Sequence, residues 1–179
     1  MKRVMIFAIL GIGFIFSSCK SGKEKQVTLT TDFPEKEVQI QENKTHCYLF
    51  SNGKDSIRMT YQIHENEVEG WLNYDFFEKD GSIGEIEGEI SGDTLKLEFE
   101  FLAEGTISKQ EVYFLKKNNY KLYRGSGEMK MNMDSLLIYS NPKEIDFSDN
   151  TPLGELKNCP ENLIKKTDQE FYLKESEKH

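Results

Sequence analysis

The sequence predicts an all-β protein, an antiparallel up-and-down meander of about seven or eight strands. From residue 45 onward, turn signals recur at near-even spacing: Asn52-Gly53, Glu65-Asn66, Asp80-Gly81, Gly92-Asp93, Glu104-Gly105 and Asn118-Asn119. Asn-Gly and Asp-Gly are the strongest of these signals, because both residues accept positive φ in a tight hairpin. Between the turns, apolar and polar side chains alternate with period two, which is typical of strands with one buried face and one wet face.

The alternation defines the strand limits. In one clear segment, polar Lys96, Glu98 and Glu100 separate apolar Leu95, Leu97, Phe99 and Phe101. We expect strands at 45–50, 55–64, 67–77, 82–90, 94–102, 107–116 and 119–131, with an eighth near 135–140 that could close the set. Closure removes exposed sheet edges. The expected fold is therefore a small barrel similar to lipocalin-like folds, with a strongly curved open sheet or a sandwich as alternatives. Bends or bulges are expected at the glycines inside strands, Gly70, Gly84, Gly88 and Gly125.

The C-terminal part has no such period. The alternation stops after Pro142, and Pro152 and Pro160 interrupt the chain further. We expect a β-barrel-like domain over 45–160, followed at 161–179 by a short helix or a disordered tail. Pro160-Glu161 could open such a helix through Leu163 and Ile164.

The N-terminus has the layout of a secretory signal. Met1-Lys2-Arg3 is cationic, residues 4–16 are apolar, and two serines precede Cys19. A transmembrane helix is the alternative, but the apolar run is short of the roughly 20 residues that a span requires. A cysteine directly after two small residues looks like a bacterial lipobox, in which the cysteine is lipidated and becomes the new N-terminus. We expect a signal peptide over 1–18, acyl chains including palmitate on Cys19, and a flexible tether over 19–44. The expected location is the bacterial cell envelope, with the anchor in the outer membrane.

Charge and export restrict the partners. Removal of Lys2 and Arg3 with the signal takes the formal net charge from −8 to −10. This acidity argues against nucleic acid and against anionic membrane surfaces as partners. It suits a soluble body on a tether, with or without a cationic partner. Outside the cytoplasm, the remaining pair Cys47 and Cys159 predicts a disulfide, with two buried thiols as the alternative.

Several short motifs follow one another in a fixed order along about half of the chain. They are Cys47-Tyr48, Val68-x-Gly70-x-Leu72-x-Tyr74, Glu78-Lys79-Asp80, Gly84, Gly88, Gly92-Asp93-Thr94-Leu95, Phe101, Glu104-Gly105, Ser108, Glu111-Val112-x-Phe114, Gly125 and Gly127. With the lipobox, they resemble a family of uncharacterised bacterial envelope lipoproteins. That family has Ser before Glu-Gly and Arg before Glu-Val, where this chain has Ala103 and Gln110. The resemblance implies a lipoprotein and this fold, and it implies no activity.

One candidate site follows from the meander itself. Hairpin turns alternate between the two ends of a sheet, so the turns at Asn52-Gly53, Asp80-Gly81 and Glu104-Gly105 should meet at one end. A ligand or partner rim is therefore predicted from Glu78, Lys79, Asp80, Glu104 and Ser108, over an apolar barrel mouth. Parity with Phe76 would point Glu78 inward, and parity with Val112 would do the same for Ser108. The alternative is turn chemistry with an ion pair that holds the strand ends.

Other residues give little support for a catalytic or metal site. Glu78 and Glu104 could form an acid–base pair only at a suitable separation, which the sequence does not define. The three histidines lack ligand spacing, and Gly125-Ser126-Gly127 lacks the flanks of a nucleophile elbow. We therefore expect no catalytic residues, no metal and no cofactor.

Two outward-facing features are ambiguous. The glutamates at 85, 87 and 89, with those at 98 and 100 beside them, could face a cationic partner or only solvent. Trp71 interrupts a polar strand face, so it marks either a contact or a site covered by the tether or the tail.

The function expected from these features is a lipid-anchored, non-enzymatic binding or interaction module. Its ligand would be a small apolar molecule or another envelope protein. The alternative is a structural or assembly accessory lipoprotein, and an envelope hydrolase has the least support. An enclosed apolar cavity would favour the first role, and a filled barrel would favour the second.

Overall fold

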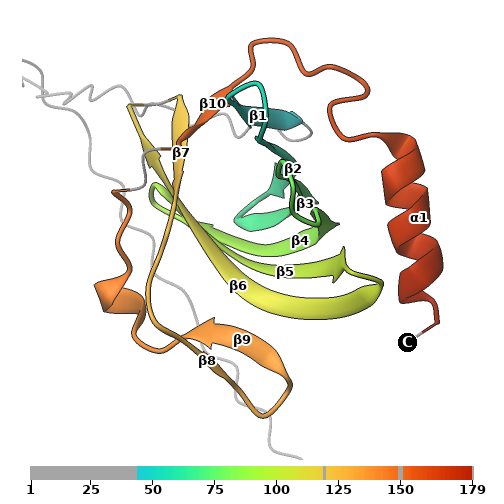
Figure 1. Ribbon diagram of the computed structural model, residues 1–179. Helices are drawn as coiled ribbons and strands as arrows, with labels where there is room; N and C mark the ends of the chain where they lie inside the picture. The colour runs from blue at the N-terminus through green and yellow to red at the C-terminus, as the bar shows by residue number, and fades with distance from the viewer. Residues whose placement is uncertain (1–43, 119, 149–150, 179) are drawn as a thin grey trace, which may run out of the picture. The chain divides into compact units, whose positions relative to one another are not determined.

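The computed structural model describes residues 44–118, 120–148 and 151–178 (Figure 1). The expected signal peptide, Cys19 and nearly all of the tether lie outside these residues. Within them the elements are β1 (His46–Ser51), β2 (Ser56–His64), β3 (Glu67–Asp75), β4 (Ser82–Ser91), β5 (Thr94–Ala103), β6 (Thr106–Lys117), β7 (Lys121–Arg124), β8 (Met129–Met131), β9 (Leu136–Tyr139), a 3₁₀ turn (Pro142–Glu144), β10 (Leu153–Glu155) and α1 (Lys166–Ser176).

Eight of the strands form a closed barrel. The ladder runs β5-β4-β3-β2-β1-β10-β7-β6, and a pairing between β5 and β6 closes the ring. The strands β1 to β6 form successive antiparallel hairpins, as predicted, with limits within two residues of those expected. The all-β class and the small barrel are thus confirmed, and the open sheet and the sandwich are excluded.

The predicted seventh and eighth strands are wrong in detail. The chain leaves the ring at Gly125, where a Cβ would come within 2.5 Å of Ile145. The expected strand 119–131 is therefore divided into β7 and β8. The expected closing strand near 135–140 is β9, which pairs with β8 and lies parallel to β6 outside the ring. The strand that completes the ring is β10, which lies between β1 and β7 in the part expected to be irregular.

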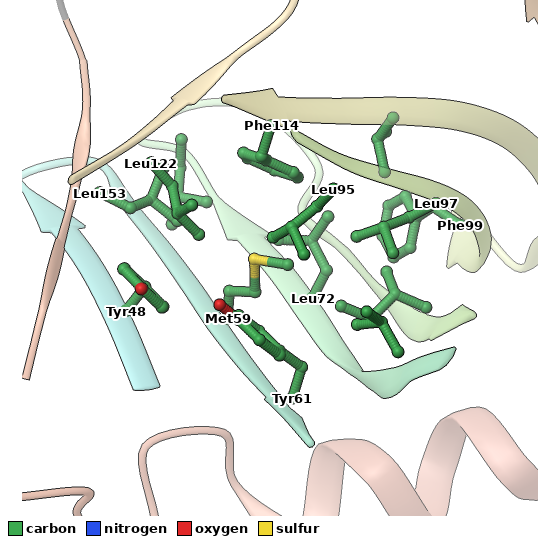
Figure 2. Close-up of a cluster of buried hydrophobic side chains, with 14 of the residues drawn as sticks. Tyr48, Met59, Tyr61, Leu72, Leu95, Leu97, Phe99, Phe114, Leu122 and Leu153 are labelled. Carbon is green, nitrogen blue, oxygen red and sulfur yellow. The ribbon is translucent and has the colours of Figure 1, made fainter. Parts of the chain in front are cut away.

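The barrel interior is filled with side chains, as Figure 2 shows for the central part of the cluster. The fully buried members include Tyr48, Met59, Leu72, Phe99, Phe114, Leu122 and Leu153. Each such side chain contributes about 1.5–3 kcal/mol by leaving water. The space that an enclosed apolar ligand would need is therefore occupied by the core.

A second apolar cluster lies on the outer face of the barrel, under the C-terminal segment. Helix α1 contacts β4 and β5. Ile164 and Tyr172 pack there with Ile83, Leu102, Trp71 and Ile107. The rings of Trp71 and Tyr172 meet edge to face, with centroids 5.5 Å apart. Trp71 is thus covered by the C-terminal segment, as the second alternative expected. The helix begins at Lys166, so the expected helical start at Pro160 is wrong.

The predicted disulfide is confirmed. Cys47 and Cys159 are bonded, with Cα atoms 5.5 Å apart across a sequence separation of 112. Cys47 is buried on β1, whereas Cys159 is exposed in the segment before α1. The bond therefore ties the barrel wall to the segment that covers Trp71. No helix in the described part of the chain is long and apolar enough to cross a membrane.

Candidate functional site

The turns of the predicted rim meet at one end of the barrel. Asp55, in the β1–β2 turn, accepts a hydrogen bond of 2.9 Å from the Phe77 backbone N–H in the β3–β4 loop. Gly81 and Glu104, from the next two turns at this end, line one shallow groove together with Phe171 of α1. The structure therefore brings the rim segments together, and their role as a ligand rim remains a prediction.

The five rim residues are exposed to solvent, namely Glu78, Lys79, Asp80, Glu104 and Ser108. The inward orientation expected for Glu78 is wrong, because β3 ends at Asp75 and Glu78 lies in a turn with φ of 59°. Strand parity does not continue through such a turn. None of the ion pairs found on described residues involves these five side chains, so no ion pair there holds the strand ends.

The inner wall at this end is aromatic. Phe76, Tyr74, Phe99 and Phe101 form a row, with successive ring centroids 5.8, 5.9 and 4.8 Å apart. Ser108 pairs with Phe101 across the ladder. Directly opposed residues share a face, so Ser108 belongs to this inner wall, as parity predicted.

The sequence analysis missed Arg124, which lies at the same end. Arg124 pairs with the buried Phe114 across the ladder and alternates with the buried Leu122, so it faces inward. Its guanidinium carbon is 5.1 Å from the centre of the Tyr74 ring, which belongs to the opposite wall. The alternation with Leu122 was the only sequence signal for this orientation.

A larger groove of about 830 Å³ lies on the outer face of β4, β5 and β6. Its side chains form three rows across the strands: Glu85, Glu100 and Lys109; Glu87, Glu98 and Glu111; Glu89, Lys96 and Tyr113. We call this surface the outer groove. Leu136 of β9 lines it as well, and Tyr172 of α1 donates a hydrogen bond of 3.0 Å to Glu100.

Charge is only partly balanced in the outer groove. Lys109 pairs with Glu98 and Glu100, and Lys96 pairs with Glu89. The hydrogen bond from Lys109 lowers the pKa of Glu100, and the Tyr172 hydroxyl adds to this effect. Burial raises the pKa of Glu85, and the nearby Glu87 and Glu100 carboxylates raise it further. The middle row places like charges in direct cross-strand contact, which is destabilising.

A titratable cluster that sequence analysis did not find lies at the start of β1. His46 stacks on Tyr61 with ring centroids 4.9 Å apart, and its Nδ1 is 3.4 Å from Glu155 Oε1. Burial lowers the pKa of His46, and the hydrogen bond to Glu155 opposes that shift. Glu155 comes from β10, 109 positions away, so no local pattern could connect the two.

No group of three or more histidine, cysteine, aspartate or glutamate side chains among the described residues is arranged to hold a metal ion. Comparison of the chain with protein-family models, curated proteins and solved structures found no match.

Proposed function

We propose that the protein is a lipid-anchored envelope lipoprotein whose barrel is a non-enzymatic interaction module. Its partner is a basic segment of another envelope protein, which binds in the outer groove. The filled interior carries this proposal, because it directs binding to the outer surface. Of the two roles expected from the sequence, the accessory role is therefore favoured over capture of an apolar molecule inside the barrel.

The electrostatics of the outer groove support a basic partner. Glu85 and Glu87 form no ion pair with any described residue, and the raised pKa of Glu85 reflects burial beside other carboxylates. A lysine or arginine from a partner would relieve this repulsion. Complementary charge of this kind accelerates association and selects partners. The Tyr113 and Leu136 side chains add apolar contact area at the edge of the groove.

Site-specific cross-linking in living cells tests the proposal. We expect a photo-crosslinking amino acid in place of Tyr113, at the edge of the outer groove, to form an adduct with one envelope protein, through a Lys/Arg-rich peptide identified by mass spectrometry. The same amino acid in place of Glu65, in the exposed β2–β3 turn, should not form that adduct.

Matched charge variants provide the control. Glu85→Gln with Glu87→Gln should abolish the adduct, whereas Glu78→Gln with Glu104→Gln removes the same charge at the rim and should leave it intact. An adduct that persists in the first variant, or that disappears only in the rim variant, would place the partner site elsewhere.

A further inference from the structure

The two arginines in the described part of the chain have opposite environments. Arg58 lies on the outer face, where it donates to Asn73 at 2.8 Å and pairs with Asp75 at 3.3 Å. Arg124 faces the barrel interior, and its Nε is buried without a hydrogen-bond partner. It stacks on Tyr74 and interacts electrostatically with Tyr139, but no described residue accepts a hydrogen bond from Nε. A buried guanidinium nitrogen without an acceptor is costly.

Part of Arg124 remains open to solvent. The residue as a whole is half-buried, and Nε is its only side-chain nitrogen that is both buried and without a hydrogen bond. The terminal nitrogens therefore keep some exposure to solvent. Because Arg124 is the last residue of β7, Ser108 and Gln110 continue the inner face of β6 beyond it, toward the rim.

Apolar surface surrounds this cation. Phe76 and Phe101, at the two ends of the aromatic row, are partly exposed and pack on the core, as does Phe50 of β1. Below them the core is filled, so a ligand would lie across the mouth and would not enter the barrel. The Glu78, Asp80 and Glu104 carboxylates stand around the rim, which disfavours ligands with several negative charges.

We propose that Arg124 is the anion-binding residue of a ligand site in the barrel mouth, and that the ligand is an organic monocarboxylate with an apolar acyl or aryl body. A planar guanidinium fork matches the two oxygens of a carboxylate. The partly exposed rings supply the contact for the apolar body. This site lies at the barrel mouth, whereas the outer groove lies on the outer face of β4, β5 and β6, so the two sites are independent.

Calorimetry on the mature lipoprotein in lipid nanodiscs tests this site, with empty nanodiscs as the blank. The probe is 3-phenylpropionate; acetate carries the charge alone, and 3-phenylpropanol carries the ring alone. We expect phenylpropionate to bind at least about 10-fold more tightly than either, because a charge-assisted pair and the ring contact both contribute. Arg124→Met should weaken binding about 10-fold or more, and Arg58→Met should leave it unchanged.

The proposal is overturned if wild type does not bind phenylpropionate, if acetate binds equally well, or if Arg124→Met binds like wild type. Circular dichroism establishes that each variant is folded. If Arg124→Met does not fold, Arg124→Lys becomes the test, since it keeps the charge and loses the fork. Unchanged affinity in Arg124→Lys would then overturn the proposal as well.

Discussion

Burial shifts the pKa of several side chains in this barrel. At His46, burial lowers the pKa even though Glu155 lies within hydrogen-bonding distance. A base whose folded-state pKa lies below its unfolded value stabilises the fold at higher pH. That stability is lost as the pH falls from the unfolded pKa, 6.5, through the lower folded-state value.

We therefore predict that His46→Gln flattens the loss of stability on acidification below about pH 6.5. Urea melts at a series of pH values between neutrality and pH 5 measure this effect. His64→Gln is the control, since it replaces an exposed imidazole at the end of β2. If the free energy of unfolding of His46→Gln falls with pH as steeply as that of the wild type, other groups cause the acid sensitivity.

The barrel wall leaves no room for a side chain at Gly84. A Cβ there would collide with the carbonyl oxygen of Glu100 on the paired strand β5. We predict that Gly84→Ala destabilises the protein by about 1–3 kcal/mol, as overpacking does. Gly154→Ala is the matched control, because its Cβ would meet only the Leu49 carbonyl oxygen at an ordinary 3.8 Å. Equal thermal melts for the two variants would contradict this prediction.

Helix α1 depends on its surroundings for its stability. It has 11 residues, which is too short for stability as an isolated helix in water. Its buried contacts are with the apolar cluster around Trp71 and Ile83 on the outer face of the barrel. The disulfide fixes the segment that precedes the helix. Packing and a covalent bond together therefore hold α1 over Trp71.

We predict that Cys47→Ser with Cys159→Ser destabilises the fold by up to about 4–5 kcal/mol, since the closed loop is long. Trp71 is the only tryptophan in the chain, so its fluorescence reports on α1 directly. Its emission should shift to the red and become more accessible to iodide in the variant. Tyr172→Ala, with the disulfide intact, removes the packing and the hydrogen bond to Glu100 but keeps the covalent bond, and so separates the two effects. Unchanged Trp71 quenching in the cysteine variant would show that α1 stays docked without the bond.

The whole molecule combines an acidic barrel with an N-terminus that has the pattern of a lipid anchor. Its formal net charge of −8 includes Lys2 and Arg3, which signal cleavage would remove. We predict that Cys19→Ala blocks lipidation, so that the protein loses its acyl mass and partitions into the aqueous phase of a detergent extraction. Cys47→Ser is the control, because it should leave both properties unchanged. Acyl mass retained on Cys19→Ala would refute the lipobox assignment.

The first six strands and the disulfide could be predicted from the sequence because their causes are local or few. Turn residues and period-two alternation specify a hairpin within about 20 residues, and two remaining cysteines leave one pairing to expect. The same reasoning failed at Glu78, where parity was continued past the end of a strand. It also failed at residues 119–140, where alternation indicated strands but not which neighbours they would join.

The amino-acid sequence by itself predicted the hairpin order and the buried faces of the first six strands, and it favoured the pairing of Cys47 with Cys159. Only the tertiary structure decided how the barrel closes. Three residues, Leu153 to Glu155, carry too little pattern to be recognised, and they form a strand because β1 and β7 present free edges on either side. The tertiary structure alone also placed Arg124 over Tyr74 and Tyr172 over Trp71. These contacts join residues 50 and 101 positions apart, and such separations are bridged by packing across the barrel and not by any local preference of the chain.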